Sequence, residues 1–356
     1  MTPADAYRAA REGAAFINRS DRVRVEFTGA QALATLNGLL TNDVTKLTPG
    51  TGQYAAALTA KGKVIADLRV FALGGTLSAH PATPANTAAS VHPGAPADPA
   101  APAVSYLVDT GAAAAPGLIA MFKKYVNPRL TNVQDVSAEI GTVGVFGPAS
   151  VATIARVCHV DALSLAALGP YAHLGGTFGG ARCTVARVPD LGVPGFDLFV
   201  PAESVSALGG ALNAAGAESL DDATADVMRI EAGRPLWGTD MDENTLAQEA
   251  ALDTMDGISF DKGCYTGQET VARVHFRGHV NRTLRGLRCQ TPPPSGARVG
   301  FGENLDTGTV RSVALSPRLG AIALAYVRRE VENGAVVTVR WEGGETQATV
   351  TPLPFG

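Results

Sequence analysis

The last part of the chain carries a series of short, strand-like runs, and this pattern limits its fold more than any other feature. From Thr283 onward the runs are separated by Gly and Pro turns, and they cover residues 284–289, 308–315, 320–327, 335–341 and 345–351. Closely spaced short strands with such turns are typical of antiparallel β-structures. The pattern therefore predicts a small antiparallel barrel or sandwich of about 75 residues.

The earlier part of the chain alternates between helical and strand-like patterns. Residues 22–27 alternate strictly between charged and apolar side chains, which predicts a strand with one exposed face. A helix over 29–40 follows, and then strands over 53–58, 64–73 and 105–109. This order predicts α+β units rather than a doubly wound parallel sheet. Residues 80–103 are mostly Pro, Ala, Ser, Thr and Gly, which predicts a flexible surface loop.

Composition and charge restrict the class of function. The chain has 356 residues, of which 46% are hydrophobic, so it is long enough for two or three domains with a substantial core. The net charge of −4 and the pI of about 5.9 argue against direct nucleic-acid binding through bulk charge. The glycine-rich motifs of dinucleotide and ATP sites do not occur.

Targeting signals and cysteine spacing indicate a compartment. The N-terminus lacks the pattern of a signal peptide, and no apolar run approaches the roughly 20 residues of a membrane span. Four scattered cysteines without a Cys-x-x-Cys pair suit a reducing cytosol and argue against a stable metal site. We therefore expect a soluble cytoplasmic protein with no membrane partner and no bound metal.

Residues 258–269 combine a thiol, an ammonium group and two glycines in a way that neither a regular helix nor a buried strand explains. The spacing of Thr266 and Glu269 fits a capping box, which predicts a helix over 268–276. Cys264 would then lie just before the helix N-terminus, where the helix dipole and Lys262 favour the thiolate. A tight loop in which the cysteine has no chemical role is the alternative that the spacing leaves open.

The segment 256–277 resembles the signature of the YgfZ-type folate-binding proteins, which are relatives of the glycine-cleavage T-protein, a tetrahydrofolate-dependent aminomethyltransferase. The residues that match the signature are Lys262, Gly263, Cys264, Tyr265, Gly267, Gln268 and Glu269. Further segments resemble the superfamily at residues 39–44, 62–68, 195–201 and 229–235. The resemblance therefore covers nearly the whole chain.

This resemblance implies an α+β, T-protein-like fold with two interwoven folate-binding units around a central cavity and a C-terminal antiparallel β-barrel. The implied units are residues 1–50 with 138–255, an inserted unit over 51–137, the motif segment 256–282 and the barrel 283–356. The implied cofactor is tetrahydrofolate or a one-carbon derivative of it.

The resemblance also implies roles for individual residues. Asp197 would grip the pterin, Arg229 would bind the carboxylate tail, and Asp67 would orient the folate nitrogen that receives the one-carbon unit. Asp67 stands out from the residues alone as well, because it interrupts an apolar strand where an unpaired carboxylate is costly to bury. Cys264 and Lys262 join Asp67 as candidate catalytic residues, and Tyr265 joins the candidate cofactor contacts.

Two functions follow from the resemblance. The first is an accessory protein that supports iron–sulfur cluster assembly or repair and, through it, tRNA modification, with iron–sulfur proteins or their assembly machinery as partners. The alternative is a folate-dependent aminomethyltransferase or another one-carbon transferase. Whether the chain is an enzyme stays open between these two hypotheses.

Overall fold

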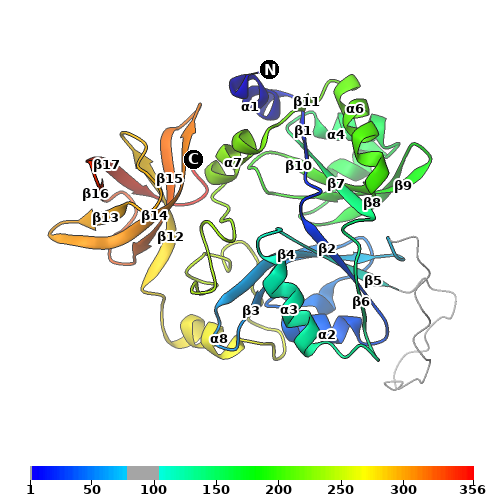
Figure 1. Cartoon of the computed structure of the whole chain (residues 1–356), viewed down its shortest axis with the longest axis horizontal. Helices are drawn as coiled ribbons and strands as arrows, with labels where there is room; N and C mark the ends of the chain where they lie inside the picture. The colour runs from blue at the N-terminus through cyan, green and yellow to red at the C-terminus, as the bar shows by residue number, and fades with distance from the viewer. Residues whose placement is uncertain (1, 78–103) are drawn as a thin grey trace.

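A computed structural model describes residues 2–77 and 104–356 (Figure 1). Within these ranges the chain forms two open sheets and a closed barrel, with the helices on the outer sides of the sheets (Figure 1). The predicted loop over 80–103 lies outside the described residues. No helix in the described ranges is both long and apolar enough to cross a bilayer.

The first sheet has six strands in the order β11-β1-β7-β10-β9-β8. Its strands are β1 (Ala15–Asn18), β7 (Ile140–Phe146), β8 (His173–Phe178), β9 (Ala181–Arg187), β10 (Gly195–Pro201) and β11 (Glu218–Ser219). Neighbours run antiparallel except for β1 and β11. Helices α4 (Ser150–Val157) and α6 (Val205–Ala214) bury apolar side chains such as Ile154 and Leu208 against Phe196 and Leu198 of this sheet.

The second sheet has five strands in the order β3-β4-β5-β2-β6. Its strands are β2 (Val23–Thr28), β3 (Gly52–Leu58), β4 (Val64–Leu73), β5 (Ser105–Thr110) and β6 (Asn132–Asp135). Helices α2 (Ala32–Leu39) and α3 (Ala115–Tyr125) cover one face through residues such as Leu36 and Phe122. Strand β2 belongs to the predicted unit that begins at residues 1–50, but it pairs in this sheet with β5 and β6, which lie in the predicted inserted unit over 51–137. The division of the chain into these units stays a prediction.

The predicted exposed face of residues 22–27 was wrong. Arg24 is fully buried and Glu26 is 2% exposed, because β2 faces other parts of the chain on both sides. The Arg24 guanidinium donates to Oγ1 of Thr142 on β7 at 3.0 Å and to main-chain oxygens of Ser20 and Ser137. Arg24 therefore joins the two sheets, whereas Glu26 accepts the Ser105 hydroxyl of β5 within its own sheet at 2.8 Å.

The C-terminal strands close into a barrel, as predicted. The order is β12-β15-β14-β13-β16-β17. The strands are β12 (Arg282–Cys289), β13 (Arg298–Phe301), β14 (Asn304–Ser316), β15 (Gly320–Arg328), β16 (Val336–Trp341) and β17 (Gly344–Thr351). Strand β13 was not predicted, because its four residues include a glycine next to an irregular register and show no alternation.

Further helices and short turns lie outside the two sheets and the barrel. They are α1 (Pro3–Glu12), α5 (Ala162–Ala166), α7 (Asp222–Glu231), α8 (Gln268–Arg277) and the short 3₁₀ turns η1 (Val44–Lys46) and η2 (Ala202–Ser204). The Asp221 side chain accepts the backbone N–H of Thr224 at 2.8 Å and so caps the N-terminus of α7. Helix α7 packs against β14 and β15 of the barrel (Figure 1).

Glu231, the last residue of α7, links three elements through one buried carboxylate. It is 2% exposed and accepts the Tyr7 hydroxyl of α1 at 2.8 Å. It also contacts the Arg11 guanidinium and accepts the Ser316 hydroxyl of β14. Its main-chain oxygen accepts the N–H of Phe355 at 3.0 Å. The carboxylate thereby holds α1, α7 and the barrel together.

We expect Glu231→Gln to lower the free energy of unfolding by about 2 kcal/mol, because hydrogen bonds to a charged group are stronger than neutral ones. Urea unfolding followed by circular dichroism measures this. Arg298→Gln is the control, since its ion pair with Asp306 is exposed and should contribute less than about 1 kcal/mol. Equal stability of the two variants would contradict the linking role of Glu231.

Candidate functional site

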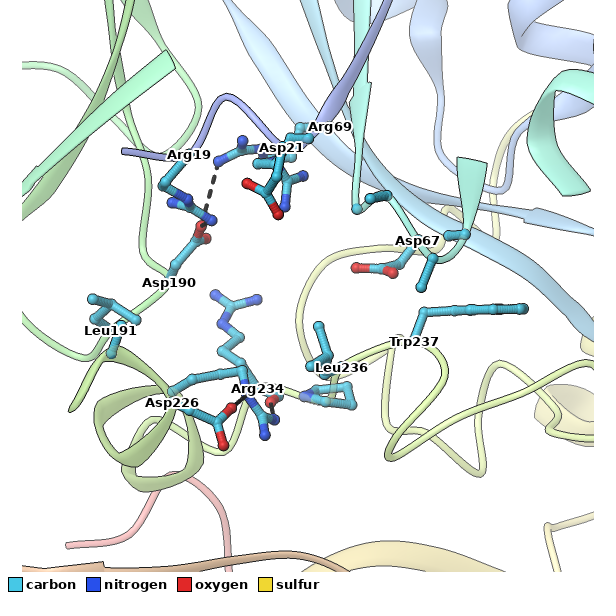
Figure 2. A pocket seen from close by; sticks show the side chains of 18 of the residues that line it. Arg19, Asp21, Asp67, Arg69, Asp190, Leu191, Asp226, Arg234, Leu236 and Trp237 are labelled. Carbon is cyan, nitrogen blue, oxygen red and sulfur yellow. Dashed lines mark hydrogen bonds and ion pairs between the residues drawn. The ribbon is translucent and has the colours of Figure 1, made fainter. Parts of the chain in front are cut away.

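A cavity of about 580 Å³ lies between the two sheets and the segment that follows α7 (Figure 2). Residues 17–19, Asp21 and Arg22 line one side, β4 contributes Asp67, Leu68 and Arg69, and residues 234–239 line the opposite side. This volume is within the range of sites that hold small molecules and cofactors. The site therefore depends on parts of the chain that are far apart in sequence.

Asp67 of β4 is the acid that the strand presents to the cavity (Figure 2). The Tyr54 hydroxyl donates to its Oδ2 at 3.1 Å, and Oδ1 has no hydrogen-bond partner among the described residues. Burial raises the pKa of the Asp67 carboxyl, although the charge of Arg22 and the Tyr54 hydrogen bond oppose this. Asp67 is therefore held in place on one oxygen, while the other stays open to a ligand.

Aromatic rings form part of the cavity wall beside Asp67. The rings of Tyr54 and Tyr171 stack with centroids 6.2 Å apart and planes 12° apart. Burial raises the pKa of Tyr171 to about 12, so its hydroxyl stays protonated at neutral pH. The Nε1–H of Trp237 also lies at the cavity and is a buried donor without a partner in the described part of the chain. The wall thus offers flat apolar surface with a free donor.

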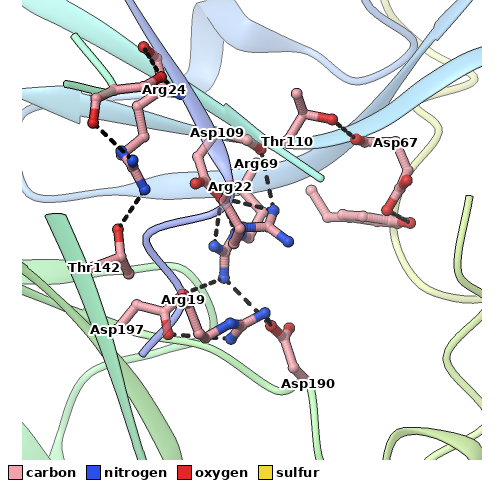
Figure 3. Close-up of polar contacts among 12 residues, drawn as sticks. Arg19, Arg22, Arg24, Asp67, Arg69, Asp109, Thr110, Thr142, Asp190 and Asp197 are labelled. Atoms are coloured by element: carbon pink, nitrogen blue, oxygen red, sulfur yellow. Dashed lines mark hydrogen bonds and ion pairs between the residues drawn. The ribbon is translucent and has the colours of Figure 1, made fainter. Parts of the chain in front are cut away.

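A series of arginines and carboxylates lies next to the cavity and joins the two sheets (Figure 3). Arg69 of β4 is 3% exposed, and its Nε donates to Oδ2 of Asp109 on β5 at 2.8 Å. Its Nη1 lies 2.7 Å from Oδ2 of Asp197 on β10 and 3.3 Å from Oδ2 of Asp190. Arg69 therefore carries ion pairs within its own sheet and across to the other.

Arg19 and Arg22 extend this arginine–carboxylate network. Arg19 lies 3.1 Å from Oδ1 of Asp197 and 2.8 Å from Oδ2 of Asp190, and Arg22 donates to Asp109 at 2.8 Å. Burial would raise the pKa of Asp109, but Arg22 and Arg69 outweigh it and lower the pKa to about 2. Burial would lower the pKa of Arg69, but its carboxylate neighbours outweigh that effect and raise the pKa. Asp109 and Arg69 are therefore both charged at neutral pH.

The structure brings Asp67 and Arg229 to the cavity, but it places Asp197 elsewhere. Asp197 is fully buried behind the lining, between Arg19 and Arg69. Its pterin contact stays a prediction that would require this ion-paired bridge to open.

Arg229 of α7 lines the cavity but is already paired. It lies 2.7 Å from both Asp226 and Asp240, and it donates to the Ser312 hydroxyl of β14 at 2.8 Å. It connects α7 to the barrel in this way. Binding of a ligand carboxylate by Arg229 therefore stays a prediction as well.

Lys262, Cys264 and Tyr265 do not line the cavity. The Lys262 Nζ donates to the main-chain oxygens of Asn37, Leu40 and Asn42 at 2.7, 2.7 and 2.8 Å. These oxygens belong to the C-terminal end of α2 and the turn after it, where a cation is favourable. Burial lowers the pKa of Lys262 to about 8, which leaves it mostly charged at neutral pH.

The two neighbours of Lys262 in the motif differ in exposure. Tyr265 is packed in the apolar core below β3 and β4, whereas the Cys264 side chain is exposed. The charge of Lys262 is directed at the end of α2. The catalytic and cofactor roles of these three residues stay predictions.

The predicted helix after the motif is present, but its predicted capping box was wrong. Helix α8 begins at Gln268, and its N-cap is Gly267 with φ +86° and no side-chain cap. A side chain at Gly267 would meet the Thr59 main-chain oxygen at 2.5 Å, so only glycine fits this close approach to the β3–β4 turn. Gly267 therefore allows the start of α8 to pack closely against the β3–β4 turn of the second sheet.

Several cavity residues were not singled out from the sequence: Arg19, Tyr54, Arg69, Tyr171, Asp190, Arg234 and Trp237. Arg69 carried the same signal as Asp67, a charge within an otherwise apolar strand. Arg19 and Asp190 lie in irregular segments whose polarity is ordinary for turns. Nothing in the local sequence pattern distinguishes them.

The whole chain has a T-protein fold. It superimposes on the aminomethyltransferase T of the glycine cleavage system from Bartonella henselae with a TM-score of 0.82, at 21% identity, covering 99% of this chain and 89% of that one. Two family models match the sequence: the GCVT N-terminal domain over residues 3–88 and 102–262, and the glycine cleavage T-protein C-terminal barrel domain over residues 282–355. The chain therefore belongs to the glycine cleavage T-protein family.

Curated relatives in this family are named aminomethyltransferases. That of Geobacillus kaustophilus is 27% identical over 357 residues, covering 98% of this chain and 89% of the relative. That of Rubrobacter xylanophilus is 29% identical over 356 residues, covering 98% and 85%. The predicted tetrahydrofolate cofactor agrees with this family, whose aminomethyltransferases use tetrahydrofolate.

The predicted role in iron–sulfur cluster assembly and tRNA modification is contradicted by these relatives. They match nearly the full chain and carry the name of a one-carbon transferase, which favours the alternative hypothesis. The motif at 262–269 covers only eight residues, whereas the similarity to the aminomethyltransferases covers nearly the whole chain. Neither the iron–sulfur partners nor the tRNA connection has support.

We expect Lys262→Met to lower the free energy of unfolding by about 2–3 kcal/mol, because the ammonium group donates three hydrogen bonds that methionine cannot replace. Cys264→Ser should change it by less than about 0.5 kcal/mol, since the thiol is exposed. Chemical denaturation of both variants measures the difference. A Lys262 variant as stable as the unmodified chain would refute the structural role.

Proposed function

We propose that the chain is a tetrahydrofolate-dependent one-carbon transferase of the aminomethyltransferase type. The observation that carries this proposal is the cavity carboxylate Asp67, held by Tyr54 on Oδ2 and open on Oδ1. The names of the relatives support the same reaction class, because their similarity extends over nearly the whole chain. Tetrahydrofolate, when bound, supplies the nitrogen atoms that carry the one-carbon unit.

The residues present fit such a cofactor. A flat pterin ring suits a wall made of Tyr54, Tyr171 and Trp237, and the free Nε1–H of Trp237 is a donor for a ligand acceptor. The open Oδ1 of Asp67 is an acceptor for a ligand N–H, and a charged acceptor makes this hydrogen bond strong. The cavity therefore offers stacking surface, one donor and one acceptor to a polar aromatic ligand.

Asp67 also has the properties of a group that accepts and releases a proton during a reaction. Burial raises the pKa of its carboxyl, which brings proton exchange closer to neutral pH than for a solvated aspartate. The Tyr54 hydroxyl fixes the orientation of the carboxyl, and the Thr110 hydroxyl donates to the Asp67 main-chain oxygen at 2.7 Å. These contacts position Oδ1 for a ligand nitrogen.

We also propose that residues 256–277 place the chain in the YgfZ-type branch of the family. The contacts of Lys262 with the end of α2 and the close packing of Gly267 support a structural use of this motif. On this view the motif holds α2, β3 and β4 in place, and Asp67 lies on the last of these strands.

We expect Asp67→Asn to weaken tetrahydrofolate binding by about tenfold or more, since a charged acceptor is lost. Calorimetry measures the affinity, and formation of methylene-tetrahydrofolate from an aminomethylated carrier measures the transfer. Asp21→Asn is the matched control, because Asp21 is an exposed acid at the edge of the same cavity. Tetrahydrofolate binding that is absent, or equal in both variants, would contradict the proposed function.

The pH dependence of binding gives a second test. Above its raised pKa Asp67 is a carboxylate that accepts a hydrogen bond, and below that pKa it is a neutral acid. We therefore expect tetrahydrofolate affinity to fall as pH drops through a value above the ordinary aspartate pKa of about 3.9. This component should disappear in Asp67→Asn. A wild-type pH profile identical to that of the variant would exclude Asp67 as the titrating group.

A further inference from the structure

Arg234 extends from the segment after α7 into the cavity (Figure 2). Its guanidinium carbon lies 5.9 Å from the centroid of the Tyr54 ring, the ring whose hydroxyl holds Asp67. Arg234 thus lies over the face of the Tyr54 ring, and Asp67 accepts from the hydroxyl of the same residue. A single bound molecule can therefore reach both groups.

Arg234 differs from the other arginines of the cavity lining. Arg19, Arg22, Arg69 and Arg229 are each within ion-pair distance of at least one carboxylate. The Arg234 guanidinium has neither an ion pair nor a hydrogen bond in the described part of the chain. Its planar group carries five N–H donors, and these remain available to a ligand.

The backbone holds Arg234 in a fixed position. Its N–H donates to the main-chain oxygen of Arg229 at 3.1 Å, and its own main-chain oxygen accepts from the Arg229 guanidinium. The preceding Gly233 has φ +67°, and a side chain there would meet Leu353 Cβ at 2.7 Å. Pro235 follows and restricts the chain further. The guanidinium is therefore presented from a rigid turn, which limits the entropy lost on binding.

We propose that Arg234 binds a carboxylate of the ligand that occupies this cavity. The guanidinium fork matches the two oxygens of a carboxylate, and the Tyr54 ring supports it from one side. This inference rests on the proposed function, which supplies one source of a carboxylate, the glutamate part of tetrahydrofolate. The second source, which the experiment separates from the first, is an amino acid that donates the one-carbon unit in place of an aminomethylated carrier. Arg234 binds the carboxylate, while Asp67 accepts a hydrogen bond from an N–H of a bound molecule.

The test compares two ligands that differ only in the glutamate group, tetrahydrofolate and tetrahydropteroate. Their affinities are measured by calorimetry for the wild type, Arg234→Gln and Arg234→Lys. Glycine and N-methylglycine are then titrated into each protein saturated with tetrahydropteroate. Arg298→Gln on the barrel surface is the control, because it removes the same charge far from the cavity lining.

Two results support the proposal and identify the source. If Arg234 binds the glutamate group, Arg234→Gln weakens tetrahydrofolate by about tenfold or more and leaves tetrahydropteroate unchanged. If it binds an amino acid, both folate ligands keep their affinity and the amino acids lose theirs by a similar factor. In either case Arg234→Lys should recover part of the loss, since it keeps the charge without the fork.

Two other results overturn it. If folate binding depends on Asp67 while Arg234→Gln changes no carboxylate-bearing ligand, the inference about Arg234 fails and the proposed function stands. If the wild type binds neither tetrahydrofolate nor tetrahydropteroate, the proposed function and the inference fail together.

Discussion

The contact between Arg69 and Asp197 is the interaction on which the rest of the structure depends. It joins the five-stranded sheet to the six-stranded sheet, and Asp109, Asp190 and Arg19 complete the charges around it. Removing one partner of a buried ion pair typically costs about 3–5 kcal/mol, because the other charge is left without compensation. Together with the hydrogen bond from Arg24 to Thr142, this contact holds the two sheets against each other beside the cavity.

The charges around the cavity fall into two groups with different uses. Those of Arg19, Arg22 and Arg69 are neutralised by aspartates and are not free to meet a ligand. Asp67 and Arg234 each keep hydrogen-bonding capacity, and both contact Tyr54. Asp67 and Arg234 can therefore make the cavity selective among ligands, because a buried polar group that finds no partner in a ligand lowers the affinity for that ligand strongly.

The sequence predicted most of the regular elements and the barrel, because their alternation and turns are local properties. It also marked Asp67, a charge within an apolar strand. It missed the burial of Arg24 and Glu26, since alternating charges look the same whether a strand faces solvent or a second sheet. It marked Lys262 as a candidate catalytic residue beside Cys264, two positions further on, but it gave no sign that the ammonium group contacts distant main-chain oxygens such as that of Leu40. Such long-range contacts leave no trace in local spacing.

The location of the ligand can be measured most directly through Trp237, one of two tryptophans in the chain. Trp341 lies in the barrel strand β16, so Trp341→Phe leaves the fluorescence of Trp237 alone. The expected result is a saturable change of this fluorescence on addition of tetrahydrofolate, with a midpoint that agrees with calorimetry and shifts to higher concentration in Asp67→Asn. Fluorescence that stays constant while calorimetry reports saturation would place the folate outside the cavity and contradict the account.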